Sequence, residues 1–262
     1  VIIKPFIGTS GLNNKIIYLI NPEENWQKPL LNARRLVDVI IPRGSNNLIE
    51  WVRKNSRLPI IETGAGVCHI FVDNNVDVKK AADIIVNAKT QRPDVCNALD
   101  TLVVHKQSLR DVLLSASKEL AKHGVEIFAD AQSYAVLRAT YPKELLRKAV
   151  LADFGKEFLS LTMAIKTVKN FDEGIKFVKE KTSGHSESIL SNYKEHIARF
   201  LKEVDSAVVY SNSSTRFTDG EEFGMGAEVG ISTQKLHSRG PMGLGALTSY
   251  KWIAKGNGQI RK

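Results

Sequence analysis

The sequence has only two cysteines among its 262 residues, Cys68 and Cys96. So few cysteines exclude a disulfide framework, and with no export signal visible at residues 1 to 5 they favour a reducing cytoplasm. No apolar run reaches the roughly 18 residues that a membrane-spanning helix needs, so no membrane partner is expected. A hydrophobic content of 43% and a charged content of 25% predict an ordinary globular protein with a substantial core.

The sequence also lacks clustered positive charge. The formal net charge is +9, yet the lysines are scattered and no block of Lys and Arg stands out. The charge therefore gives little support to a nucleic-acid partner, and it fits either attraction of anionic small molecules or a merely basic surface. No metal is expected, because Cys68 and His69 have no second Cys/His pair at ligand spacing. Both are predicted to be packing residues.

What the sequence does have is a regular alternation of strand-like and helix-like segments. Predicted strands cover residues 37–41, 59–62, 67–72, 101–105, 125–128, 158–168, 186–190 and 207–210, with weaker ones at 1–3 and 15–20. Predicted helices cover residues 46–57, 78–89, 108–123, 171–181 and 192–203, with helical pieces at 130–149. This alternation of β and α units predicts an α/β fold with parallel strands.

Cys96 lies between the predicted helix 78–89 and the predicted strand 101–105. It follows an arginine and is predicted to stand where a short helix begins, and both features favour thiolate over thiol. A thiolate is the form that attacks a carbonyl carbon. The residues alone leave a second interpretation open, a buried structural cysteine, which is the commoner case for a single cysteine.

The segment TQRPDVCNALDTLVVH, residues 90–105, resembles the catalytic-cysteine segment of the gamma-glutamyl phosphate reductase family, within the aldehyde dehydrogenase superfamily. Further resemblances follow in the family's order: IIPRG at 40–44, CHIFVD at 68–73, VDSA at 204–207, STRFTDG at 214–220, FGMGAEVGISTQKLH at 223–237 and RGPMGL at 239–244. They cover about residues 36 to 262. Because the family normally has a longer N-terminal portion, the resemblance implies the C-terminal part of such an enzyme or a shortened relative.

The resemblance implies an aldehyde dehydrogenase-like α/β fold. Residues 1–65 would be the remnant of a Rossmann-type dinucleotide-binding domain, and residues 66–244 the α/β catalytic domain. Residues 245–262 would form a C-terminal strand that pairs with a second copy in a homo-oligomer.

The implied reaction is NADPH-dependent reduction of L-glutamyl 5-phosphate to L-glutamate 5-semialdehyde and phosphate through a cysteine thioester, a step of proline biosynthesis. Two alternatives from other classes stay open. The first is a catalytically impaired fragment, or an interaction or oligomerisation domain, that keeps the catalytic fold. The second, from the charge alone, is a nucleic-acid binder.

The family's functional residues map onto named positions. The catalytic candidates are Cys96, Asn97 and Glu62, which resembles the superfamily's general base. The Cys96 backbone N–H and either the side chain or the backbone of Asn97 would be oxyanion donors. The cofactor-binding candidates are Arg43, Gly44 and Ser45 in a strand-to-helix turn, and Glu157, which resembles a ribose-binding glutamate. The substrate-binding candidates are Ser214, Thr215, Arg216 and Arg239, which offer hydroxyls and guanidinium groups to an anion. The residue patterns alone leave a surface acid or a surface loop open at these places.

Overall fold

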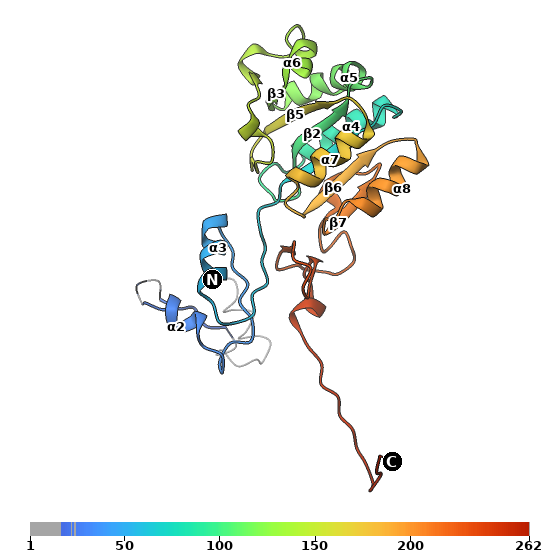
Figure 1. Ribbon diagram of the computed structural model, residues 1–262. Helices are drawn as coiled ribbons and strands as arrows, with labels where there is room; N and C mark the ends of the chain where they lie inside the picture. The colour runs from blue at the N-terminus through green and yellow to red at the C-terminus, as the bar shows by residue number, and fades with distance from the viewer. Residues whose placement is uncertain (1–16, 22, 24, 262) are drawn as a thin grey trace.

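A parallel seven-stranded sheet forms the centre of the molecule in a computed structural model that describes residues 17–21, 23 and 25–261 (Figure 1). Its strands are β1 (Cys68–Val72), β2 (Leu99–His105), β3 (Glu126–Ala129), β4 (Leu146–Lys148), β5 (Thr162–Val168), β6 (Ser186–Leu190) and β7 (Val208–Ser211). They lie in the order β4-β3-β5-β2-β1-β6-β7, and every neighbouring pair is parallel. The predicted α/β class is confirmed.

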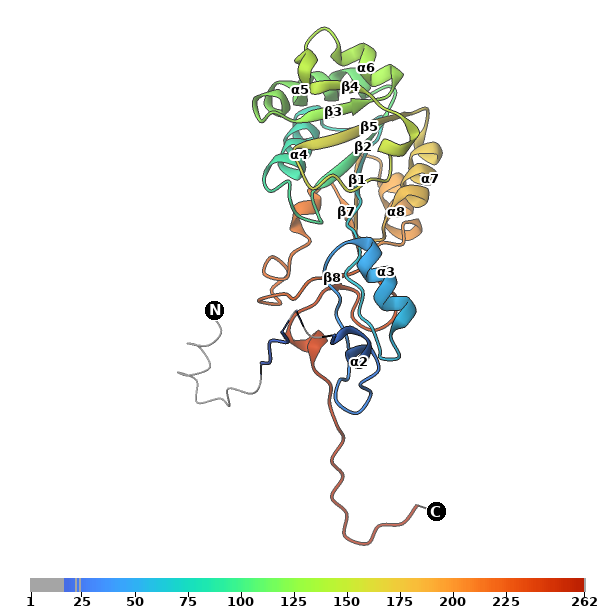
Figure 2. The same ribbon diagram turned by 90° about the vertical axis from the view of Figure 1, so that its left-hand side faces the viewer.

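Helices cover both faces of this sheet (Figure 2). On one face lie α4 (Val78–Thr90), α5 (Leu109–Lys122) and α6 (Ala131–Leu137); on the other lie α7 (Phe171–Lys181) and α8 (Lys194–Glu203). Strand β1 is buried along its whole length, and Ile70 and Val72 pack toward α4 and α5 while Phe71 packs toward α7 and α8. A strand covered on both sides reads as a continuous apolar run, which is why the sequence indicated this sheet so clearly.

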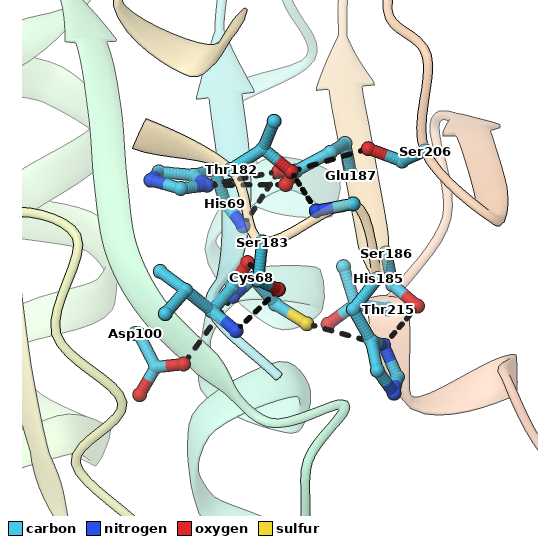
Figure 3. A network of polar contacts seen from close by, with 12 residues as sticks. Cys68, His69, Asp100, Thr182, Ser183, His185, Ser186, Glu187, Ser206 and Thr215 are labelled. Carbon is cyan, nitrogen blue, oxygen red and sulfur yellow. Dashed lines mark hydrogen bonds and ion pairs between the residues drawn. The ribbon is translucent and has the colours of Figure 1, made fainter. Parts of the chain in front are cut away.

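A fully buried hydrogen-bonded pair, His69 and Glu187, joins β1 to β6 (Figure 3). His69 Nδ1 lies 3.0 Å from Glu187 Oε2, and the same carboxylate oxygen accepts the backbone N–H of His69 at 2.8 Å. His69 and Cys68 are both fully buried, as their interpretation as packing residues predicted.

Most predicted elements of the sheet domain form within a few residues of the expected bounds. Asp77 caps α4 by accepting the backbone N–H of Lys80, and Asn170 caps α7 by accepting that of Glu173. The sequence missed β4, a short edge strand with one buried side chain, Leu146, which is preceded by a 3₁₀ turn, η2 (Lys143–Leu145).

The segment before the sheet is less regular than predicted. It contains α2 (Gln27–Leu31) and α3 (Asn46–Asn55), and Ser45 rather than Asn46 provides the N-cap of α3. The strands predicted at 37–41 and 59–62 meet only at a single parallel bridge between Ile40 and Ile60. The strand predicted at 1–3 lies outside the described residues, and the described part of 15–20 forms no strand.

The last part of the chain leaves the body of the molecule. Strand β8 (Ile231–Ser232) pairs antiparallel with β9 (Gly240–Pro241), and a 3₁₀ turn, η5 (Leu244–Leu247), follows. Residues 248–261 are exposed and run away from the body in both views (Figures 1 and 2), so the strand predicted there forms no pairing within the described chain. The predicted domain boundaries stay predictions. No helix among the described residues is both long and apolar enough to span a bilayer.

Candidate active site

Cys96 lies in a turn between the end of α4 and the start of β2. The helix start predicted at this residue is therefore wrong. Its backbone is instead held against Gly66, where a Cβ atom would come within 2.0 Å of the Cys96 carbonyl oxygen. Only glycine permits so close an approach. The Cys96 side chain is partly buried and not part of a disulfide.

The thiol opens on a cleft of about 680 Å³ between the sheet domain and the segment that carries α3. Of the residues predicted to be functional, the cleft is lined by Arg43, Gly44, Ser45, Cys96, Asn97, Glu157 and Arg216. These residues are far apart in sequence, and folding brings them around one thiol. A cleft with convergent polar groups is the usual form of a small-molecule site.

Arg43, Gly44 and Ser45 approach the cleft at the start of α3. Gly44 has a φ of +143°, a backbone conformation that residues other than glycine rarely adopt. The Ser45 hydroxyl caps α3 by accepting the N–H of Leu48, so it is committed to the helix. Arg43 packs on Gly230, where a Cβ would lie 2.6 Å from Nη1. A guanidinium beside a helix N-terminus is a suitable place for an anionic group.

Glu157 reaches the cleft from the segment before β5. Its Oε1 accepts the N–H of Gly66 at 2.9 Å, so the carboxylate also anchors the segment that supports Cys96. The next residue, Phe158, donates its N–H to Asp100 Oδ1, and Asp100 Oδ2 accepts the N–H of Cys68. Burial raises the pKa of Asp100 to about 6, so it is still largely ionised at neutral pH and can hold both amides.

In the loop at residues 214–218, Arg216 and Thr218 line the cleft, and Phe217 is exposed. Arg216 lines the cleft, and its Nε donates to Gln91 Oε1 at 2.7 Å. Ser214 and Thr215 are buried: the Ser214 hydroxyl accepts the N–H of Arg216, and the Thr215 hydroxyl donates to the carbonyl of Asn97 at 2.7 Å. The geometry thus makes Ser214 and Thr215 supports of the loop rather than substrate contacts.

Two further predicted residues lie outside the cleft. The neighbours of Glu62, Thr63 and Gly64, line it, but Glu62 itself does not, and its backbone N–H bonds to Gln234. Arg239 forms an ion pair with Asp205 at 2.8 Å and donates to the Asp205 carbonyl as well. The structure therefore does not bring either side chain to the thiol.

Asn97 is almost fully buried, and both hydrogens of its amide are used. Its Nδ2 donates to the carbonyl of Thr218 at 2.9 Å and to that of Arg216 at 3.4 Å. The predicted role of its side chain as an oxyanion donor therefore conflicts with the geometry. Only the backbone of Asn97 can serve in that role.

Four charged residues of the cleft were not among the predicted site residues: Arg92, Asp94, Asp219 and Glu228. Arg92 precedes Cys96 by four residues in the segment 90–105, and Glu228 lies in the glycine-rich segment 223–230. Their positions in segments that resemble the family could have indicated that both belong to the site. Burial lowers the pKa of Arg216 and the positive charge of Arg92 lowers it further. Two guanidinium groups close enough to affect each other suit an anion with more than one charge.

The electrostatic surroundings of Cys96 oppose the thiolate. Burial raises the pKa of the thiol to about 11, the negative charges of Glu157 and Glu228 add to this effect, and Arg43 opposes it. The expectation that the fold lowers this pKa is wrong, because no helix begins at Cys96 and carboxylates stand beside it. In the protein alone the thiol stays protonated at neutral pH.

We therefore expect the rate of Cys96 alkylation by iodoacetamide to rise about tenfold per pH unit from pH 7 to 10, since only the thiolate reacts. Mass spectrometry of the labelled peptide measures this rate. Cys68 is the internal control, because complete burial also raises the pKa of its thiol and shields it from the reagent. If the alkylation rate of Cys96 reached a plateau near neutral pH, the pKa of its thiol would not be raised as the structure indicates.

Within the described residues, no group of three or more His, Cys, Asp or Glu side chains is placed to hold a metal ion. The chain also matches no family model.

The sheet order and the helices on both faces define an aldehyde dehydrogenase-like fold. An acetylating aldehyde dehydrogenase from Geobacillus thermoglucosidasius shares this fold, with a TM-score of 0.71 over 97% of this chain and 64% of that one at 16% identity. By sequence, the chain is similar to gamma-glutamyl phosphate reductases, as the resemblance of its motifs predicted.

The gamma-glutamyl phosphate reductase of Legionella pneumophila (strain Paris) is 52% identical over 99% of this chain. The crystal structure of gamma-glutamyl phosphate reductase from Thermotoga maritima superposes with a TM-score of 0.85 at 43% identity, covering 93% of this chain and 57% of that one. The chain spans about 62% of the length of the Legionella protein.

Proposed function

We propose that this chain carries out acyl transfer from L-glutamyl 5-phosphate to Cys96, in the reduction of that substrate to L-glutamate 5-semialdehyde. One observation supports this most directly: a single thiol lies in a cleft that is also lined by three guanidinium groups, those of Arg43, Arg92 and Arg216. An acyl phosphate needs a nucleophile for its carbonyl carbon and cations for its phosphate. The names of the relatives agree with this substrate.

The chemistry at Cys96 begins with removal of the thiol proton. Glu157 and Glu228 both line the cleft and lie close enough to Cys96 to raise its pKa, so one of them is suited to accept the proton. The sulfur then forms a bond to the acyl carbon, and the bond from that carbon to the phosphate oxygen breaks. Phosphate leaves with the electron pair, and a thioester remains. Arg92 and Arg216 stabilise the phosphate that departs.

The residues around the cleft fit a nicotinamide dinucleotide. Arg43 and the start of α3 offer a cation and a helix N-terminus to its phosphates, and Gly44 leaves room for a close backbone approach. We propose NADPH as this cofactor, on the basis of the family resemblance. When bound, it would supply the hydride that converts the thioester to the aldehyde.

We also propose that the chain forms a homo-oligomer through residues 248–261. Tyr250, Trp252 and Ile253 are exposed on this segment, and large exposed hydrophobic side chains are typical of a surface that another chain covers. The same segment carries unpaired backbone groups that an added strand could use.

The test of the proposed function is oxidation of glutamate semialdehyde, the reverse reaction, followed at 340 nm with NADP⁺. We expect the rate to depend on inorganic phosphate, because phosphate is the group that takes the acyl moiety from Cys96. Arg216→Leu should raise the KM for phosphate at least about tenfold, since a charge-assisted contact is lost. Arg239→Leu removes an arginine that lies outside the cleft and is the matched control. A phosphate-independent rate, or equal effects of the two substitutions, would contradict the proposal.

A further inference from the structure

Cys68 begins β1 directly beneath the turn that carries Cys96, and the proposed chemistry gives it no role. It is fully buried, and its Sγ donates to the carbonyl oxygen of Cys96 at 3.2 Å. Complete burial raises the pKa of this thiol well above its usual range, with Glu187 and Asp100 adding to the effect. Cys68 therefore keeps its proton and remains a hydrogen-bond donor.

The Cys96 carbonyl is held from a second direction by Gly66. The absence of a side chain at Gly66 lets the Cys96 carbonyl lie where a Cβ would be 2.0 Å away. Gly66 is in turn held by Glu157, and Cys68 by Asp100, through their backbone N–H groups. The Cys96 carbonyl thus rests on two anchored residues of one short segment.

A chain of polar contacts runs from Cys68 through His185 to Ser186 (Figure 3), and Thr218 connects Ser186 to the Asn97 side chain. Cys68 Sγ lies 3.6 Å from His185 Nδ1, which lies 2.8 Å from Ser186 Oγ. Ser186 Oγ lies 2.7 Å from Thr218 Oγ1, and the Thr218 carbonyl accepts from Asn97 Nδ2. Burial lowers the pKa of His185 to about 4, so this histidine is neutral and adds no charge beneath the thiol.

The orientation of the Cys96 carbonyl fixes that of the next N–H. In a trans peptide, the N–H points opposite to the C=O of the same unit. The Cys96 carbonyl points toward Cys68 and Gly66, so the Asn97 N–H points away from them. Within the described part of the chain, the Asn97 N–H makes no hydrogen bond. Because the side-chain amide of Asn97 already donates to two carbonyls, the backbone N–H is the remaining donor of this residue.

We propose that Cys68 is a positioning residue for acyl transfer: its S–H···O=C bond fixes the Cys96–Asn97 peptide so that the Asn97 N–H serves as an oxyanion donor. The inference rests on the proposed role of Cys96 as nucleophile. As the sulfur bonds to the acyl carbon, the carbonyl oxygen gains negative charge, and a preorganised N–H stabilises that charge. A peptide that can rotate would place the donor correctly only part of the time.

The test uses 4-nitrophenyl acetate, which needs neither cofactor nor phosphate. The Cys96 sulfur bonds to the acetyl carbon, the carbon–oxygen bond breaks, 4-nitrophenolate leaves with the electron pair, and the thiol proton passes to buffer. The burst of 4-nitrophenolate gives the acylation rate, with Cys96→Ala as background. Alkylation by iodoacetamide is the second readout. It forms a bond to the same sulfur without developing an oxyanion, so an oxyanion donor does not affect it.

We expect Cys68→Ala to slow acylation about tenfold, since the donor is misaligned rather than removed, and to leave alkylation within about twofold. Cys68→Ser keeps a hydroxyl donor and should restore most of the acylation rate. Val72→Ala truncates another fully buried side chain of β1 away from the turn, and it controls for a general loss of packing. It should leave both rates near those of the unaltered protein.

Several results would overturn the inference. One is a normal acylation rate in Cys68→Ala, and another is a serine variant as slow as the alanine variant. A parallel fall of acylation and alkylation would show that Cys68 merely keeps the thiol in place. A protein with no Cys96-dependent burst would also refute it. Failure of semialdehyde oxidation with the burst and its Cys68 dependence intact would instead count against the proposed function alone.

Discussion

Replacing Cys96 with alanine is expected to abolish semialdehyde oxidation, with a loss on the order of 10⁴ or more, because no other thiol among the described residues lines the cleft. The other cysteine, Cys68, is sealed in the core and cannot substitute for it. Cys96→Ser should be nearly as inactive. A serine hydroxyl loses its proton far less readily than a thiol, and the carboxylates that raise the pKa of Cys96 oppose an alkoxide even more strongly.

The fold should survive this change. The contacts that hold the turn involve the Cys96 carbonyl rather than its sulfur. We therefore expect thermal denaturation to show a free-energy change of less than about 1 kcal/mol for a truncated, partly exposed side chain. Residual activity within tenfold of the unaltered protein would remove Cys96 from the reaction, whereas a large fall in melting temperature would make the loss of activity uninformative.

Replacing Gly66 with alanine should lower the rate strongly, although it removes none of the side chains that take part in the reaction. The new Cβ would lie 2.0 Å from the Cys96 carbonyl oxygen and 2.7 Å from its Cβ. Both distances are far shorter than van der Waals contact. Because the new Cβ would clash with the backbone of Cys96, the turn that carries Cys96 must move by about 1 Å or more. A displacement of that size at a nucleophile reduces the rate by about 10²-fold. Overpacking should also lower the free energy of unfolding by about 1–3 kcal/mol.

Gly245→Ala is the matched control, because a Cβ at Gly245 would meet no atom within 4 Å. Kinetics of semialdehyde oxidation and urea denaturation, measured on both variants, separate the two sites. If Gly66→Ala retained the rate of the control variant, the close contact between Gly66 and Cys96 would not exist in solution.

The sequence predicted the sheet domain well because its strands and helices carry strong local patterns. Strand β6 was predicted at its observed residues, and α4 has a cap, Asp77, that can be recognised from one residue. The segment before β1 was predicted less well. Its apolar runs at 37–41 and 59–62 resemble buried strands, yet Val39 remains exposed and only one bridge forms. A strand requires neighbours, and local sequence does not report whether they are present.

The candidate site shows a similar limit. Family motifs identified Cys96, Arg43, Glu157 and Arg216, which line one cleft. They did not distinguish Arg216, which faces the cleft, from Thr215, whose hydroxyl supports the Asn97 backbone. Which way adjacent side chains point depends on a 3₁₀ turn, η4 (Thr215–Phe217), that spacing alone does not indicate. The pKa of Cys96 was unpredictable for the same reason, since Glu157 is distant in sequence.

The pair that joins His69 to Glu187 connects residues 118 positions apart. Strand β1 lies inside the sheet between β2 and β6, and it therefore acquires its neighbour β6 only after most of the chain has been made. Loop closure over such a distance carries an entropic penalty before any contact offsets it, and domains with many such contacts fold slowly. Cys68 is the first residue of this strand and Gly66 lies just before it, so the turn bearing Cys96 gains its support late. While only β1 to β5 have left the ribosome, Cys96, the proposed nucleophile, still lacks its final geometry.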